Sequence, residues 1–387
     1  MRKPPAKKGK HTAHAGASKE RTEPTQVCSK RPTTSAQTQS NAPNAKPVDE
    51  ANEIQRIILG KYSIAVWYTS PYPDEYTHTR DLFICQQCLK YMRHRETLDS
   101  HVCPDPFPRG RRVYEDATSA LFEVDGKAHT LYCQNLCLLS KLFLDQKTIY
   151  YDIGGFLFYV LLSKQPATAV GSFSSPADAT EYTFVGYFSK EKSSVERNNL
   201  ACILVLPPFR GQSYGQLLIE LSYELTKMEG TTGGPEQPLS SQGFHSYRSY
   251  WRRAIVQALL GVLPQAEKYL RHSCGRKQHT SEAVVEQRVF SLSRLAQLTG
   301  IRIEDVLFTL EDLGLLGTWY GKHVVCIADD TIQQVISTRR INPGMRMDFS
   351  GLQVDNDTMQ ESLSEQESDD SGPNSSNSDN ESSADSS

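Results

Sequence analysis

Four side chains in the first third of the sequence have the types and the spacing of a zinc site. Cys85 and Cys88 form a Cys-x2-Cys knuckle, and His101 and Cys103 follow after twelve intervening residues. Tetrahedral zinc takes four such thiolate and imidazole ligands. The sequence therefore predicts a structural zinc finger over about residues 82–110. The alternative is two ordinary buried cysteines and a surface histidine.

The chain between the two halves of this site has to bring them together. A helix is predicted over residues 91–99. Residues two apart do not share a helix face, so His101 and Cys103 converge only if that helix ends before them. Pro104 favours such an end. His94 is the alternative ligand, and the only mildly basic linking segment favours a structural role over nucleic-acid reading.

A second arrangement has the pattern of an anion-binding turn. A predicted strand over residues 201–206 is followed by the turn PPFRGQSYG at residues 207–215, and then by a predicted helix over residues 216–228. The N–H groups at the start of a helix and its positive end attract phosphate groups, and Arg210 adds positive charge. Because glycine turns before helices are common, this pattern alone is weak evidence for a site.

Short apolar runs alternate with helical patterns through the body of the chain, which indicates a mixed α/β fold. The other predicted strands cover residues 82–84, 148–151, 156–162 and 184–188. A long Ser/Ala/Pro/Gly-rich loop is expected at residues 163–182.

Both ends of the 387-residue chain differ in composition from its body. Residues 1–50 hold ten basic and four acidic residues, whereas residues 352–387 hold ten acidic residues and no basic one. Neither segment has apolar periodicity, so we predict a disordered basic arm and a disordered acidic tail. The basic cluster at residues 7–10 is either a nuclear-import signal or part of a solvated arm.

Composition also argues against a secreted or membrane protein. The N-terminus lacks the apolar stretch of a secretory signal, and the most apolar run, residues 156–162, is far shorter than the ~20 residues that cross a bilayer. Nine cysteines without such a signal favour a reducing compartment. We expect no membrane partner.

From about residue 54 to residue 316 the sequence resembles the MYST family of histone acetyltransferases. The matching blocks follow the family's order at residues 67–73, 122–127, 132–139, 141–145, 186–192, 198–204 and 246–251. Blocks of this length and order exclude chance similarity. The resemblance implies an α+β protein with a mixed α/β acyl-CoA N-acyltransferase (GNAT-like) core over about residues 111–260. Acetyl-CoA would be the cosubstrate, and the zinc finger would be of the C2HC type.

The resemblance also implies the site residues. Glu236, in the block PEQPLS, resembles the family's catalytic general base, and Cys202 resembles its active-site cysteine. Lys147 matches the lysine that family members autoacetylate, and the family's zinc ligands match the Cys/His set above. Coenzyme contacts are expected at Leu204, Val205, Leu206, Arg210, Gly211, Gln212, Ser213, Tyr214, Gly215, Gln216, Leu217, Ser240 and Ser249.

A glutamate suits this chemistry. A free lysine has a pKa near ~10.4 and is almost wholly protonated at neutral pH, so it cannot attack a thioester unaided. A glutamate whose pKa is raised by burial can remove that proton. Without the resemblance, Glu236 would as readily be a carboxylate at the start of a helix.

Cys202 and Lys147 each keep more than one interpretation. Cys202 lies in a predicted apolar strand, where burial disfavours the thiolate, so we expect it to line the thioester pocket rather than to carry an acetyl group. It would otherwise be a small core side chain. Acetylation of Lys147 would alter the electrostatics of a nearby carboxylate cluster. The alternative is a lysine held in a salt bridge.

Three features depart from the family pattern. The family's turn reads Gln-Arg-x-Gly-x-Gly, whereas Arg210, Gly211 and Ser213 occupy its first, second and fourth positions. Ser213 replaces the glycine that lets backbone approach phosphate most closely, which puts coenzyme affinity in question. The last two zinc ligands are spaced two residues closer than usual. The expanded loop after residue 162 is a candidate partner contact.

Two further helices, over residues 291–298 and 303–313 with Gly300 between them, predict a helix-turn-helix flank over about residues 285–320. Ser291 or Ser293 would cap the first helix, and Gly300 suits its exit. The resemblance implies that this flank helps to grip the substrate peptide. A helix-turn-helix can also enter the DNA major groove, but the acidic residues of the second helix argue against sequence-specific DNA binding.

Together these patterns predict a histone lysine acetyltransferase with a catalytic region at residues 51–351. The short, polar N-terminal segment favours the compact fungal silencing-type branch of the family. That branch implies the histone H4 tail and nucleosomes as substrates, a nuclear location and work within a multiprotein complex. The rival interpretation is a chromatin-binding scaffold that has lost catalysis. Ser213 favours this rival, whereas Glu236 and Cys202 argue against it.

Overall fold

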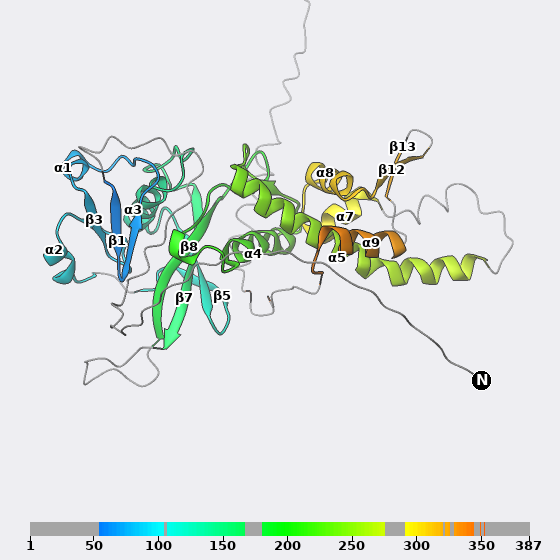
Figure 1. Cartoon of the computed structure of the whole chain (residues 1–387), viewed down its shortest axis with the longest axis horizontal. Helices are drawn as coiled ribbons and strands as arrows, with labels where there is room; N and C mark the ends of the chain where they lie inside the picture. The colour runs from blue at the N-terminus through cyan, green and yellow to red at the C-terminus, as the bar shows by residue number, and fades with distance from the viewer. Residues whose placement is uncertain are drawn as a thin grey trace, which may run out of the picture. The chain divides into compact units, whose positions relative to one another are not determined.

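A computed structural model describes residues 54–103, 107–166, 180–274, 291–319, 322–325, 329–343, 349 and 352. The predicted basic arm and nearly all of the acidic tail lie outside these residues, as does most of the predicted loop after residue 162. The described part contains both helices and sheets, which confirms the mixed α/β fold class (Figure 1).

The N-terminal part is a four-stranded sheet in the order β2-β1-β3-β4. Its strands are β1 (Arg56–Leu59), β2 (Tyr62–Ala65), β3 (Asp81–Ile84) and β4 (Tyr91–Met92), with the short helices α1 (Asp74–Thr77) and α2 (Arg95–Asp99). β1 runs antiparallel to β2 and parallel to β3. Apolar side chains alternate along these strands, so Ile57, Leu59, Leu82 and Ile84 enter the core.

The predicted helix over residues 91–99 is correct only in its second half. Tyr91 and Met92 form β4, which pairs antiparallel with β3, and α2 begins at Arg95. Met92 packs against the buried Cys85 and Cys88, so tertiary packing outweighs the helical pattern at this point.

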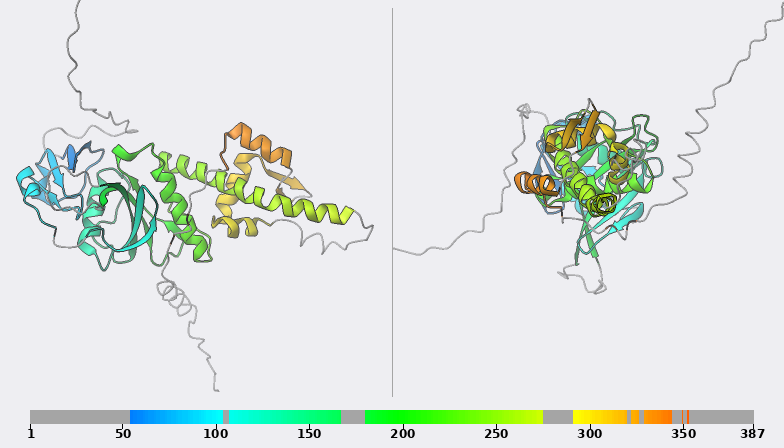
Figure 2. Two further views of the ribbon diagram at one scale, coloured as in Figure 1. Left: turned by 90° about the horizontal axis from the view of Figure 1, so that it is seen from below. Right: turned by 90° about the vertical axis from the view of Figure 1, so that its right-hand side faces the viewer.

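The central sheet has the order β10-β8-β7-β6-β5, with every neighbouring pair antiparallel. Its strands are β5 (Arg111–Glu115), β6 (Ser119–Asp125), β7 (Phe156–Pro166), β8 (Thr180–Glu191) and β10 (Ile203–Val205). The left view of Figure 2 shows its strong curvature. The strands predicted at residues 156–162 and 184–188 are confirmed, but both are longer. Pairing from Ser163↔Thr183 to Pro166↔Thr180 extends them into the predicted loop.

Two other predicted strands need correction. Residues 148–151 form no strand, and Ile149 and Tyr151 are exposed instead of buried. The Tyr151 hydroxyl donates to the carbonyl of Pro71 at 3.2 Å, which fixes this segment by a side-chain contact. The strand predicted at residues 201–206 is limited to β10, because the chain bulges before Ile203.

The helices around this sheet are α3 (Thr130–Lys141), the 3-10 turn η1 (Pro207–Phe209), α4 (Tyr214–Met228) and the long α5 (Ser241–Cys274). The helix predicted at residues 216–228 is confirmed as α4, which begins two residues earlier. Beside α4, β9 (Asn198–Leu200) and β11 (Gly234–Pro235) form a short parallel pair. This pair lies next to the residues predicted to do the chemistry.

The C-terminal part consists of α7 (Leu292–Thr299), α8 (Ile303–Leu313), β12 (Leu316–Trp319), β13 (Lys322–Val325) and α9 (Asp329–Arg339). Ser291 caps α7 by accepting a bond from the Arg294 N–H at 3.1 Å, and Gly300 ends it with φ +70°. Both predicted helices are therefore present within one residue. Their role as a helix-turn-helix unit stays a prediction. These helices pack on α5 around a second apolar core that includes Trp251, Leu295 and Leu310 (Figure 1).

Candidate functional site

The four predicted zinc ligands converge. The ligand atoms of Cys85, Cys88, His101 and Cys103 all lie within 4.8 Å of one another. His101 Nε2 is 3.2 Å from Cys88 Sγ and 3.4 Å from Cys103 Sγ, and the Cys85 and Cys103 sulfurs are 3.4 Å apart. Three thiols and one imidazole at these distances are the donor set of a structural zinc site.

The end of α2 makes this convergence possible. The helix stops at Asp99, and Ser100 forms its C-cap, so His101 and Cys103 lie beyond the helix, as the predicted stop requires. On the other side, the β3–β4 hairpin carries Cys85 and Cys88. His94 is the residue before α2 and does not belong to the metal-binding group found among the described residues. The alternative with His94 as a ligand is therefore not supported.

The predicted anion-binding turn is open. Gly211 has φ +75° and Ser213 has φ +65°, and α4 starts at the next residue, Tyr214. A Cβ atom placed on Gly211 or on Gly215 would have no heavy atom within 4 Å. There is therefore open space on the side where these Cβ atoms would lie, and the first N–H groups of a helix have no partner within the helix itself.

Ser213 adopts the left-handed backbone conformation that the family's glycine would adopt without cost. For a residue with a Cβ this conformation costs roughly 1–2 kcal/mol. Its side chain makes no capping hydrogen bond to α4. Ser213 therefore adds strain and a side chain at an exposed position of the turn.

The side chain of Arg210 is held by contacts with other parts of the protein. Its guanidinium stacks over Trp67, 4.1 Å from the ring centroid, and Nε donates to the carbonyl of Val205 at 3.0 Å. Nη1 contacts Gln242 Oε1 at 3.3 Å. Burial lowers the pKa of Arg210. The side chain thus links the turn to the N-terminal sheet and to the start of α5, two contacts that sequence spacing could not reveal.

The starts of α4 and α5 lie together. Gln216 Nε2 donates to the carbonyl of Ser246 at 2.9 Å, and Ser240 Oγ accepts from the Gly243 N–H at 3.1 Å. The other predicted coenzyme contacts divide by exposure. Leu204, Leu206 and Leu217 are buried, Val205, Tyr214, Gly215 and Gln216 are half-buried, and Gln212, Ser240 and Ser249 are exposed.

Glu236 immediately follows β11. Its N–H donates to the carbonyl of Leu200 at 2.8 Å, which ties the residue to the end of β9. Although Glu236 is exposed, partial desolvation raises the pKa of its carboxyl, and the negative charges of Glu191 and Glu196 raise it further, while Lys147 acts in the opposite direction. A carboxylate with a raised pKa accepts a proton more readily near neutral pH.

Cys202 is placed differently from its prediction. It is half-buried and lies in a bulge between β9 and β10 rather than within a strand. The N–H of Ala201 donates to the carbonyl of Ser189 at 2.8 Å, and the Ser189 N–H donates to the carbonyl of Cys202 at 2.8 Å. Ala201 and Cys202 therefore both lie opposite Ser189, which is the arrangement of a β-bulge.

Lys147 lies beside Cys202, and the distance from Lys147 Nζ to Cys202 Sγ is 3.9 Å. Its side chain is buried, and within the described residues no carboxylate is in ion-pair range of its ammonium group. The described residues therefore give no support to the alternative of a lysine held in a salt bridge. Lys147 thus contacts Cys202, and its positive charge also acts on the carboxyl of Glu236, whose pKa it lowers.

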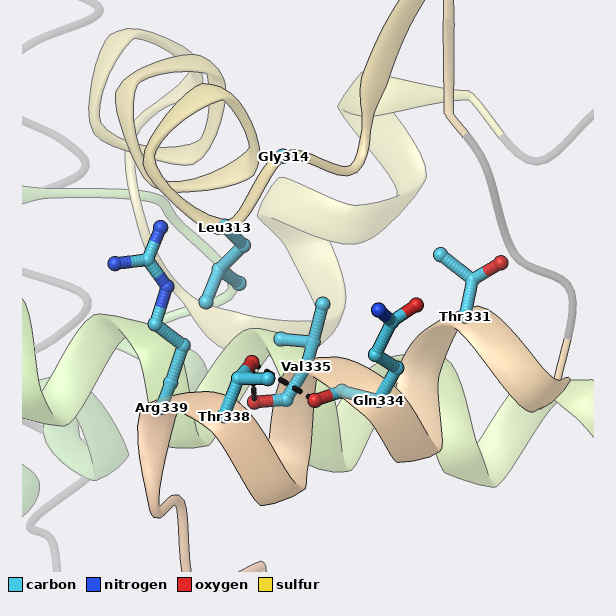
Figure 3. A pocket seen from close by; sticks show the side chains of 7 residues that line it. All are labelled: Leu313, Gly314, Thr331, Gln334, Val335, Thr338 and Arg339. Carbon is cyan, nitrogen blue, oxygen red and sulfur yellow. Dashed lines mark hydrogen bonds between the residues drawn. The ribbon is translucent and has the colours of Figure 1, made fainter.

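A cavity of about 370 Å³ lies elsewhere, between the end of α8 and one face of α9 (Figure 3). Leu313, Gly314 and Val335 line it together with polar side chains of α9. None of the predicted site residues lines this cavity.

Comparison with known proteins agrees with this geometry. A family model described as the MOZ/SAS family matches residues 107–350, and one described as the MYST family zinc finger domain matches residues 51–103. The chain therefore belongs to the MOZ/SAS family and carries a MYST family zinc finger.

Curated relatives include proteins named as histone acetyltransferases. The chain is 39% identical over 282 residues to histone acetyltransferase MOF of Drosophila melanogaster, covering 72% of this chain and 30% of that protein. It is 42% identical over 305 residues to putative MYST-like histone acetyltransferase 1 of Oryza sativa subsp. japonica, covering 78% and 59%. For histone acetyltransferase of the MYST family 1 of Arabidopsis thaliana the identity is 42% over 279 residues, covering 72% and 54%. The matched part is thus less than two thirds of each relative.

Among the residues that the structure describes, no helix is long and apolar enough to cross a membrane.

Proposed function

We propose that the protein transfers the acetyl group of acetyl-CoA to a lysine side chain of a histone tail. The observation that carries this proposal is Glu236, a carboxylate whose pKa is raised and whose backbone N–H is bonded to the end of β9, two residues before Cys202. The names of the relatives and the open turn before α4 support the same reaction.

In the proposed reaction Glu236 takes a proton from the ammonium group of the substrate lysine. The neutral amine attacks the thioester carbonyl carbon, and the bond from carbon to sulfur breaks. The nitrogen then loses a second proton, which coenzyme A takes up as it leaves as the thiol, while Glu236 releases the first proton to solvent. The role of Cys202 is to line the thioester pocket, because it sits half-buried in the bulge at the sheet edge. Backbone donors around that bulge would stabilise the oxyanion.

The coenzyme would lie along β10 and the turn at residues 210–217. The pyrophosphate would accept from N–H groups at the start of α4, and Ser240 and Ser249 would contact the coenzyme from α5. The zinc would hold the β3–β4 hairpin against α2 and take no part in acetyl transfer. Lys147 would be the autoacetylation site.

The proposal extends to the bounds of the catalytic region, to its C-terminal flank and to the substrate. We place the catalytic region at residues 51–351, with α7 and α8 as a helix-turn-helix flank that contacts the substrate peptide. The favoured substrate is the histone H4 tail on nucleosomes, in the nucleus, within a multiprotein complex. The acidic start of α8 supports a peptide-binding rather than a DNA-binding role.

A catalytically weakened chromatin-binding scaffold remains the second candidate, because Ser213 strains the turn that would hold the coenzyme. The test is transfer of labelled acetyl groups to an H4 tail peptide by the purified full-length chain, with mass spectrometry of nucleosomes to locate the modified lysine. Glu236→Gln is the control. Absence of transfer by the unaltered protein, with the peptide still bound, would favour the scaffold, and equal turnover by both proteins would overturn the role of Glu236.

A further inference from the structure

The turn between α7 and α8 is bonded directly to Gly233, the residue before β11, and Glu236 is the residue after β11. The Gly233 N–H donates to the carbonyl of Gly300 at 2.9 Å, and the Arg302 N–H donates to the carbonyl of Gly233 at 3.0 Å. Gly233 and Ile301 form a β-bridge through this pairing. A segment of the C-terminal part therefore continues the short pairing of β9 and β11.

The side chain of Arg302 reaches further along the same strand. Its Nη2 donates to the carbonyl of Pro235, the residue before Glu236, at 2.6 Å, and lies 3.4 Å from Asn198 Oδ1 on β9. The peptide group between Pro235 and Glu236 is thus held from two sides, by Arg302 through its carbonyl and by Leu200 through the Glu236 N–H.

Two features keep the guanidinium in place. Asp305, in the first turn of α8, places Oδ2 3.2 Å from Arg302 Nε, an ion-pair distance at which these two largely buried groups make no hydrogen bond. Gly234 leaves the room that the guanidinium fills, since a Cβ at that position would lie 2.1 Å from Arg302 Nε. Arginine presents several donors in a fixed planar fork, which suits one side chain that must bind two acceptors and a carboxylate.

We propose that Arg302 is a positioning residue that holds the Pro235–Glu236 peptide group in place, so that the α7–α8 turn forms part of the scaffold of the general base. This inference rests on the proposed acetyltransferase function and deepens it. The C-terminal flank would then set the catalytic rate, in addition to any contact it makes with the substrate peptide.

The test compares Arg302→Met, which keeps the apolar stem and removes every donor, with Arg302→Lys, which keeps the charge. Arg294→Met, at an exposed position of α7, is the matched control. Hydrogen exchange of the segment at residues 231–238 measures the positioning directly. We expect faster exchange in Arg302→Met, intermediate exchange in Arg302→Lys and unchanged exchange in Arg294→Met.

Steady-state kinetics supply the second readout. A small displacement of a base can lower kcat by about 10- to 100-fold, and we expect a loss of this size in Arg302→Met with partial rescue in Arg302→Lys. KM for acetyl-CoA should change less than about twofold, because Arg302 is not among the residues of the turn at 210–217. Gly234→Ala tests the same contact from the other side, should Arg302→Met fail to fold, and should reproduce the fall in kcat.

Wild-type exchange and kcat in the Arg302 and Gly234 variants would overturn the proposal, as would a loss confined to KM for acetyl-CoA. The exchange measurement does not depend on activity. If the unaltered protein transfers no acetyl group, the proposed function fails while the exchange result still decides whether Arg302 holds the strand.

Discussion

The zinc finger and the proposed acyl-transfer site are built in opposite ways. All four Cys/His side chains of the finger come from residues 85–103 and meet within 4.8 Å. The proposed acyl-transfer site uses side chains that are far apart in the sequence, at positions 147, 202 and 236. The supporting contact proposed above adds position 302. The first site is local in sequence, whereas the second depends on the whole fold.

The two sites also differ in the interactions that hold their residues in place. Three thiolates and an imidazole can share one small volume when a metal ion binds them, so the ion would contribute folding free energy to a small sheet. At the acyl-transfer site the order comes from backbone pairing and from buried apolar side chains of both cores. Loss of one group should therefore unfold structure in the finger and lower the rate at the other site.

The largest effect is expected from removing a zinc ligand. Cys88→Ser should abolish stoichiometric zinc binding and expose the N-terminal sheet, because apparent binding free energies of structural zinc are about 10–16 kcal/mol. Zinc content and limited proteolysis of residues 54–103 measure this. Gln87→Ser, at an exposed position within the same knuckle, is the control. If Cys88→Ser kept its full zinc content, the finger would tolerate the loss of one ligand, and the expected difference between the two sites would be wrong.

A loss of rate without loss of structure is expected at Glu236. Glu236→Gln should lower kcat for acetyl transfer by about 10²- to 10⁴-fold, the usual contribution of a general base. Glu196→Gln removes a neighbouring negative charge without removing the base, and should keep most of the activity. Thermal unfolding of both variants should match the unaltered protein. Comparable losses of kcat in the two variants would show that only local charge matters.

A shift in pH dependence is expected from Lys147. Glu236 acts as a base only when ionised, so the rate should rise with pH through its pKa, and the raised pKa places this rise above the ordinary carboxyl range. Lys147 lowers that pKa, so Lys147→Gln should move the acidic limb of the kcat/KM profile to higher pH. Lys147→Arg keeps the charge and is the control. An unmoved limb in Lys147→Gln would mean that the two side chains act independently.

The smallest effect is expected at the turn before α4. Ser213→Gly removes a left-handed residue with a Cβ, and the relief of roughly 1–2 kcal/mol should strengthen acetyl-CoA binding severalfold if the turn tightens on the ligand. Isothermal titration with acetyl-CoA measures the Kd. Arg340→Gly, which removes a left-handed residue with a Cβ outside the turn, is the control. Weaker binding by Ser213→Gly would show that the serine hydroxyl contributes to the site.

The same contrast decides what the sequence could predict. The spacing of the cysteines and the histidine predicted the four residues of the finger. Apolar periodicity predicted the ends of α4, α7 and α8 to within two residues. Periodicity failed at residues 148–151, where Tyr151 is held by one hydrogen bond to Pro71. It also failed at Tyr91 and Met92, which pair as a strand. Arg302 was missed because its acceptors, Pro235 and Asn198, are distant in the sequence.

The bulge at Ala201 and Cys202 makes the length of this strand critical. Because side chains alternate between faces, the extra residue sets which face Cys202 and every residue before it present to the sheet. Deleting Ala201 would keep the apolar composition of the segment and leave β10 paired with Gly186–Phe188. Yet it would turn the β9 side chains to the opposite face. It would also move Leu200, whose carbonyl accepts the hydrogen bond from the Glu236 N–H. The tolerance of this segment to insertion or deletion should therefore be far lower than its tolerance to substitution.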